Sequence, residues 1–190
     1  MVQTISKPLT LSEFLKLPET EPASEYIDGQ IIQKPMPQGD RSVIQGELII
    51  AINAVVKPQK LARAFPELRC IFGGRAIVPD VAVFTWERIP RKENGGVANV
   101  ANVFEAAPDW IIEILSPDQS ATKVTQKILH GLNFETEMGW LIDPDDRTLL
   151  VYRPQQQREI CDRSAQQLPV PSFAGELRLT VGELFGWLLE

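Results

Sequence analysis

The chain contains only two cysteines and one histidine, and it has no long apolar run. Cys70 and Cys161 lie far apart without a CxxC motif, so nothing indicates a disulfide framework or a structural zinc site, and we expect two free thiols. No apolar stretch approaches the ~20 residues that span a bilayer, and Met1 to Thr20 has no basic start before an apolar segment. We therefore expect a cytoplasmic protein that does not enter a membrane.

Net positive charge is also lacking, because 25 acidic residues outnumber 19 lysines and arginines and leave a net charge of −6. This charge excludes a protein whose whole surface attracts nucleic acid, since phosphate contacts need clustered lysine and arginine. The segment from Lys57 to Lys92 differs, with eight basic residues against three acidic ones. It is either a local DNA-binding surface or a solvated charged surface.

The length and the 44% hydrophobic content suit one core, so we expect a single domain over residues 1–190. Helices are expected at Leu9 to Leu17, from Asp40 to Pro58, at Lys123 to Phe134 and at Val181 to Leu189. Strands are expected at 24–27, 31–34, 68–72, 76–84, 110–115, 140–142, 149–152, 159–161 and 177–179, and a long loop at 87–108. The pattern predicts an α/β (α+β) fold.

Two acidic residues lie inside apolar, strand-like runs. Asp80 falls in the run from Ala76 to Phe84, and Glu113 is the one charged residue of Trp110 to Leu115. An ionised carboxylate buried there needs a cation, a hydrogen-bond network or a raised pKa. If the two acids converge, a hard divalent cation such as Mg²⁺ or Mn²⁺ would keep both ionised.

A simpler explanation exists for each acid taken alone. Each could form an ordinary ion pair, or Asp80 could cap a turn. The cations considered as partners are Arg75, Lys123 and Lys127. What favours a shared site is the order of strand, strand and a lysine-bearing helix.

These residues resemble a known nuclease pattern. Pro79-Asp80 followed by Glu113-Ile-Leu115 is similar to the PD and (D/E)X parts of the PD-(D/E)XK nuclease superfamily. Position 115 is leucine where that pattern has lysine. Lys127, on the helix after the strand, matches the displaced lysine of some branches of the superfamily.

More closely, the chain resembles the Uma-type family of restriction endonucleases over nearly its whole length. The resemblance rests on Glu25-Tyr-Ile-Asp-Gly29, Ile77-Val-Pro-Asp-Val-Ala82, Ile112-Glu-Ile-Leu-Ser-Pro117, Lys127 and Trp140-Leu-Ile-Asp-Pro144. It implies a restriction-endonuclease-like fold, with a mixed central β-sheet flanked by helices. It also implies metal-dependent hydrolysis of the DNA backbone.

The same resemblance implies roles for individual residues. Asp80 and Glu113 match metal ligands for Mg²⁺ or Mn²⁺, and Ile114 would add its backbone carbonyl. Lys127 matches the positive charge near the attacked phosphate. Glu25 is a further candidate catalytic residue, and the alternative for it is an acid on the surface of the hairpin.

Two other functions remain open: a non-catalytic DNA-binding or partner-binding module that keeps the nuclease fold, and a structural protein whose acids are buried ion pairs.

For two further residues the sequence leaves alternatives open. Arg41 stands where relatives carry histidine, and it would contact phosphate or face solvent. The lone His130 is expected to be a packed or exposed side chain. We also expect a homodimer, because two symmetric sites would cut two strands.

Overall fold

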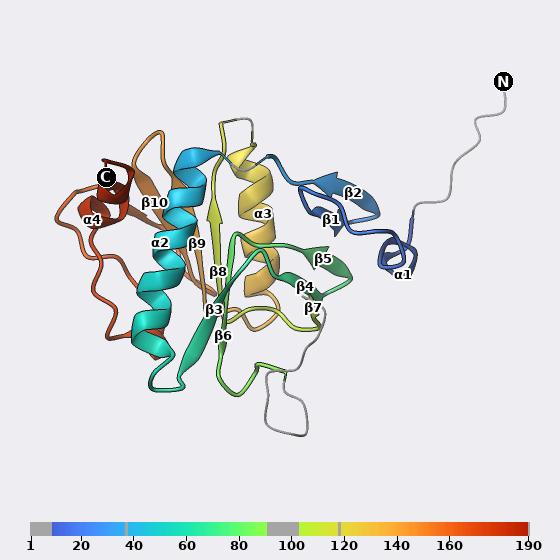
Figure 1. Ribbon diagram of the computed structural model, residues 1–190, viewed down its shortest axis with the longest axis horizontal. Helices are drawn as coiled ribbons and strands as arrows, with labels where there is room; N and C mark the ends of the chain where they lie inside the picture. The colour runs from blue at the N-terminus through green and yellow to red at the C-terminus, as the bar shows by residue number, and fades with distance from the viewer. Residues whose placement is uncertain (1–8, 37, 91–102, 118, 190) are drawn as a thin grey trace.

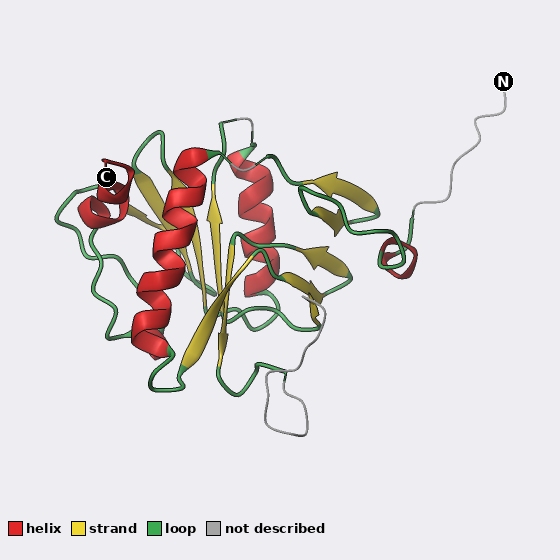
Figure 2. Cartoon of the chain, in the orientation of Figure 1, coloured by secondary structure: helices red, strands yellow, loops and turns green. Residues whose placement is uncertain are grey.

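The protein is described here by a computed structural model, which defines residues 9–36, 38–90, 103–117 and 119–189. Figure 1 shows the course of the chain, and Figure 2 separates its helices from its strands. Helices and mixed β-sheets occur together, so the predicted α/β (α+β) fold class is confirmed.

The helices include one long helix and several short ones. They are α1 (Leu11–Phe14), α2 (Gly39–Val56), α3 (Ala121–Leu132), α4 (Val181–Gly186) and the 3₁₀ turns Ser172–Ala174 and Trp187–Leu189. None of the helices in the described ranges is long and apolar enough to cross a membrane.

The strands form two sheets. The five-stranded sheet, in the order β2-β1-β5-β4-β7, consists of β1 (Ser24–Ile27), β2 (Gln30–Gln33), β4 (Arg69–Phe72), β5 (Arg75–Ile77) and β7 (Val103–Phe104). The six-stranded sheet, in the order β11-β10-β9-β8-β6-β3, consists of β3 (Ala62–Pro66), β6 (Val81–Thr85), β8 (Trp110–Ile114), β9 (Met138–Asp143), β10 (Thr148–Tyr152) and β11 (Glu159–Cys161). In the six-stranded sheet β8 and β9 are parallel and the other pairs are antiparallel.

Helices α2 and α3 cover opposite faces of the six-stranded sheet, as Figure 1 shows. Successive side chains of a strand point to opposite faces. In β6, Val81 and Val83 accordingly pack in the layer of α2, whereas Ala82 and Phe84 pack in the layer of α3. Every residue of β8 is buried, which confirms a strand covered on both faces.

The predicted strand from Ala76 to Phe84 is two strands. Residue Ile77 ends β5 in the five-stranded sheet, and Val81 begins β6 in the six-stranded sheet. Pro79 lies between them and has no amide hydrogen to donate to a strand ladder. Asp80 therefore lies where the chain crosses between the sheets, and not inside a strand as predicted.

Other boundaries also differ from the sequence prediction. Strand β3 was not predicted, and 177–179 form no strand. Of the expected loop from 87 to 108, residues 91–102 lie outside the described part of the chain. The same predicted loop contains the short strand β7, and the predicted helix from Leu9 to Leu17 is only the four residues of α1. The other predicted elements begin and end close to their predicted positions because they follow apolar periodicity and turn residues.

Two glycines allow the close contact between α3 and the sheet to be tested. A Cβ at Gly139, in β9, would lie 2.1 Å from Ile128 Cγ2, whereas a Cβ at Gly46, in α2, would meet no described atom within 4 Å. We expect Gly139→Ala to lower the free energy of unfolding by about 1–3 kcal/mol. Gly46→Ala should raise it by about 0.5–1 kcal/mol. Urea unfolding measures both, and equal effects at the two positions would contradict this helix–sheet contact.

Candidate active site

Asp80 and Glu113 lie side by side at the ends of neighbouring strands. Strand β6 pairs with β8 so that Val81 lies opposite Ile112, which places Asp80 opposite Glu113 one step further on. The link is direct, because the Ile114 amide donates to Asp80 Oδ2 at 2.7 Å. Both carboxylates are buried. The structure thus brings together the two acids that the sequence singled out.

Lys127 reaches Glu113 from α3. Its ammonium nitrogen lies 2.9 Å from Glu113 Oε1, and the side chain is buried. Helix α3 covers the face of the sheet to which Ile111, two residues before Glu113, also points. The lysine displaced by 14 positions from Glu113 in the sequence is therefore adjacent to it in space.

Glu25, on β1, joins the same cluster from the other sheet. Its Oε1 accepts a hydrogen bond from Lys127 Nζ at 2.9 Å and another from the Val78 amide at 2.8 Å. Only 3% of the residue is exposed. The alternative of an acid on the surface of the hairpin is therefore wrong.

Two further cations contact Asp80, and the sequence interpretation did not find them as its partners. Lys34 Nζ donates to Asp80 Oδ1 at 2.8 Å and to the Val78 carbonyl at 2.8 Å. Arg41 Nη2 also contacts Asp80 Oδ1. The considered partner Arg75 pairs with Asp28 instead.

Arg41 is buried, so the alternative in which it faces solvent is wrong. A signal for this was present in the sequence. Arg41 precedes Ile44, Leu48 and Ile52 at helical spacing, which places it on the apolar face of α2. For Lys34, which follows β2, no comparable periodicity exists.

Glu67 forms the outer edge of the cluster. Its carboxylate oxygens accept from Lys34 Nζ at 2.9 Å, from Gln45 Nε2 at 3.3 Å and from Arg41 Nη2 at 3.4 Å. The side chain is 41% exposed, unlike the buried cations that it contacts.

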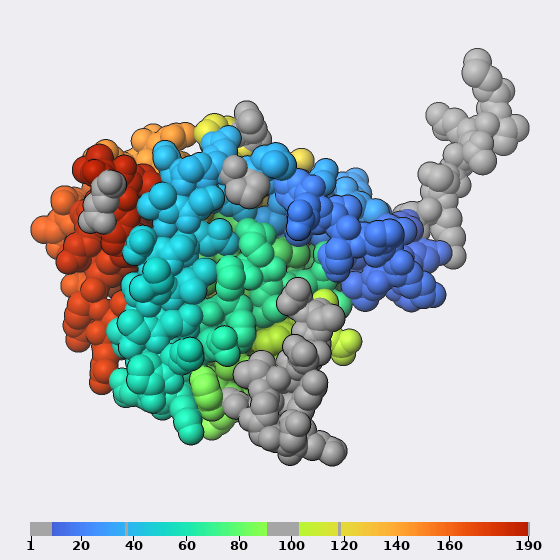
Figure 3. Space-filling view, viewed as in Figure 1, coloured from blue at the N-terminus to red at the C-terminus, as the bar shows by residue number. Residues whose placement is uncertain are grey.

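A groove of about 830 Å³ opens on this side of the cluster. Its lining includes Lys34, Arg41, Gln45, Glu67 and Arg69. In Figure 3 the blue N-terminal segment and the pale blue start of α2 lie beside the green middle of the chain on this face.

The two acids have opposite pKa shifts. Burial raises the pKa of Asp80, but the charges of Lys34 and Arg41 outweigh it and leave the pKa below its usual value. Burial raises the pKa of Glu113 to about 7, and the charge of Lys127 offsets this only in part. Burial lowers the pKa of Lys127, yet Glu113 and Glu25 outweigh it and the pKa is raised. Lys127 is thus a cation throughout the neutral range.

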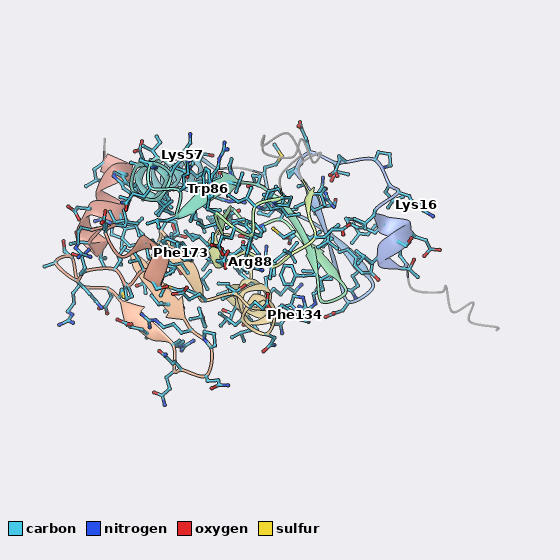
Figure 4. All side chains as sticks on the ribbon, turned by 90° about the horizontal axis from the view of Figure 1, so that it is seen from below. Lys16, Lys57, Trp86, Arg88, Phe134 and Phe173 are labelled. Atoms are coloured by element: carbon cyan, nitrogen blue, oxygen red, sulfur yellow. The ribbon has the colours of Figure 1, made fainter. Side chains whose placement is uncertain are left out.

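The single histidine lies away from these acids. His130 stacks on Phe72 with ring centroids 5.0 Å apart, and its Nε2 lies 3.3 Å from the Phe72 carbonyl oxygen. Phe134, labelled in Figure 4, packs against both rings, with its centroid 4.9 Å from that of His130 and 5.9 Å from that of Phe72. Burial lowers the pKa of His130, as expected for a packed aromatic ring.

The oxygen atoms of this cluster fit a hard divalent cation that takes few ligands from the protein and the rest from water. In the described ranges no group of three or more histidines, cysteines or acids could hold a metal ion, so a metal would rely on two carboxylates, a backbone carbonyl and water. Glu113 Oε1 is buried and accepts no hydrogen bond from the described residues, although Lys127 Nζ lies near it. A cation beside Asp80, Glu113 and the Ile114 carbonyl would satisfy that oxygen.

Comparison with known proteins identifies the family of the chain. Residues 11–182 match the Uma2 family, described as "Putative restriction endonuclease". The fold is similar to the crystal structure of a putative nuclease belonging to DUF820 from Anabaena variabilis ATCC 29413, with a TM-score of 0.92 and 65% identity over 95% of this chain and 99% of that chain. The cryo-EM structure of a DrdV–DNA complex matches with a TM-score of 0.33 and 12% identity over 78% of this chain and 13% of that chain, which supports no argument. No match was found among curated proteins. Because the family match spans most of its length, the chain belongs to the Uma2 family of putative restriction endonucleases.

Proposed function

We propose that this protein is a DNA endonuclease that hydrolyses phosphodiester bonds and requires Mg²⁺ or Mn²⁺. One observation carries the proposal: Asp80, Glu113 and Lys127 come from separate elements and meet in one buried cluster. Membership of a nuclease family supports the reaction class. Cleavage by a homodimer in the cytoplasm stays a prediction from the sequence.

Asp80, Glu113 and the backbone carbonyl of Ile114 would hold the metal ion. When bound, such an ion polarises a phosphodiester oxygen and lowers the pKa of an attacking water. Asp80 is suited to this role because its lowered pKa keeps it ionised. Glu113 must lose a proton near neutral pH, since its pKa is about 7.

Lys127 would offset the negative charge that develops on the attacked phosphate. Its raised pKa keeps it protonated in that role. Glu25 is the positioning residue, because its Oε1 binds Lys127 Nζ and is itself fixed by the Val78 amide.

The formal charges of the cluster also suit this function. Its members are the carboxylates Glu25, Glu67, Asp80 and Glu113 and the cations Lys34, Arg41 and Lys127. With every group ionised, the carboxylates exceed the cations by one charge. A bound divalent cation would change the net charge of the cluster from negative to positive. A site of net positive charge attracts a phosphodiester.

A second candidate function is a DNA-binding module without catalysis. Asp80 Oδ1 already accepts from Lys34 and lies against Arg41, so this acid is compensated without a metal ion. Leu115 also stands where the superfamily pattern has lysine. This alternative predicts salt-sensitive DNA binding that does not change when metal is removed, without cleavage.

Removing either proposed metal ligand should abolish cleavage. We expect Asp80→Asn and Glu113→Gln to reduce Mg²⁺-dependent nicking of plasmid DNA by at least about 100-fold, since each removes a charge that the ion requires. Asp145→Asn, at an exposed turn, removes the same charge and should cut like the parent. Circular dichroism would check that each variant is folded. Parental nicking by both site variants would exclude these roles.

Metal binding should strengthen as the pH rises through 7. Below the pKa of Glu113, about 7, the ion must displace a proton, so the affinity should fall by up to about tenfold per pH unit. Above that pKa the affinity should level off. Calorimetric titration with Mn²⁺ from pH 6 to 8.5 measures this. An affinity independent of pH, or unchanged in Glu113→Gln, would contradict Glu113 as a ligand.

Loss of Lys127 should separate cleavage from metal binding. Lys127→Gln is expected to lower the rate of DNA cleavage by about 100-fold or more, because the cation near the attacked phosphate is lost. It should still bind one Mn²⁺, because the proposed ligands remain. Lys123→Gln, one turn earlier on α3 and exposed, is the matched control and should retain cleavage. A catalytic role for Lys127 would be excluded if both variants cleaved equally well.

A further inference from the structure

The groove beside the active site contains an anion-binding arrangement that the metal site does not use. Lys34, Arg41 and Gln45 direct nitrogen donors to one place, where they meet the Glu67 carboxylate. Both cations are nearly buried, at 6% and 4% exposure. All three side chains line the groove, so an anion arriving from solvent could reach them.

The Glu67 carboxylate leaves part of the hydrogen-bonding capacity of these donors unused. Its contact with Lys34 is 2.9 Å, but those with Gln45 and Arg41 are long, at 3.3 and 3.4 Å. Arg41 Nη1 is buried and has no hydrogen-bond partner among the described residues. A guanidinium commonly binds phosphate oxygens through two nitrogens at once, whereas Arg41 contacts Glu67 only through Nη2.

Glu67 is also placed where it can leave. It lies in the short turn between β3 and β4, with a φ of 46°. Its side chain is 41% exposed, whereas the cations remain fixed by Asp80 when it departs. Moving Glu67 into solvent therefore requires no change in the buried part of the cluster.

We propose that Lys34, Arg41 and Gln45 form a phosphate-binding subsite for the DNA backbone, which the Glu67 carboxylate fills in the free protein and DNA must displace. The inference rests on the proposed function, since it takes DNA as the substrate. Because Lys34 and Arg41 also touch Asp80, the subsite would hold a backbone phosphate next to the metal site. Glu67 thus competes with DNA.

Neutralising this competitor should strengthen DNA binding. Fluorescence anisotropy with a short labelled duplex, in EDTA and at low salt, measures binding without cleavage. We expect Glu67→Gln to bind about 5–10-fold more tightly than the parent, with a salt dependence steeper by about one phosphate contact. Gln45→Glu, which adds an acid to the same place, should weaken binding by a similar factor.

Glu47→Gln is the matched control. It removes the same charge from α2, but two residues after Gln45 and so on roughly the opposite side of the helix, outside the groove lining. Its affinity should stay within about twofold of the parent, as expected for a charge that does not compete directly. The subsite is excluded if Glu67→Gln binds no more tightly than Glu47→Gln, or if neither binds DNA.

Cleavage measured in parallel with Mg²⁺ separates this inference from the proposed function. Tighter binding by Glu67→Gln without cleavage by any variant would support the subsite and exclude the nuclease. Cleavage that depends on Asp80, together with no effect of Glu67→Gln on binding, would exclude the subsite and leave the nuclease in place.

Discussion

The burial of two carboxylates at the junction of two sheets is the constraint on which the site depends. Asp80 and Glu113 lie in an interior where an uncompensated charge would cost far more than a domain's net stability. Compensation comes from segments distant in sequence. Lys34 follows the hairpin, Arg41 begins the long helix, and Lys127 lies on the helix after β8. The crossover at Pro79 positions the acids, and these cations make their burial possible.

The same compensation gives the two acids different chemistry. Two cations keep the pKa of Asp80 low, whereas Glu113 has a pKa of about 7 with one close cation. A site of this kind has one permanent anion and one whose charge depends on pH or on a metal ion. The partners that stabilise Asp80 also face the groove, so stability and substrate binding involve the same residues.

Local sequence patterns predicted part of this arrangement. The apolar runs around Glu113 and Asp80 drew attention to these acids, and the resemblance to a nuclease family added Lys127 and Glu25; the structure brings all four together. Neither Lys34 nor Arg41 was assigned to Asp80, because these pairs lie 46 and 39 positions apart in the sequence, where neither helix nor strand periodicity predicts a contact. The change of sheet at Pro79 was missed because apolar residues continue on both sides of it. Arg41 could have been found from its place on the apolar face of α2.

Anomalous diffraction from a crystal soaked in Mn²⁺ tests most directly whether Asp80 and Glu113 share one metal ion. A shared site predicts one strong manganese peak within about 2.4 Å of an oxygen of each carboxylate, with the Ile114 carbonyl as a further ligand. Absence of such a peak at saturating Mn²⁺, with Asp80 still held by Lys34 and Arg41 and Glu113 by Lys127, would contradict it. The acids would then be a buried ion-pair network.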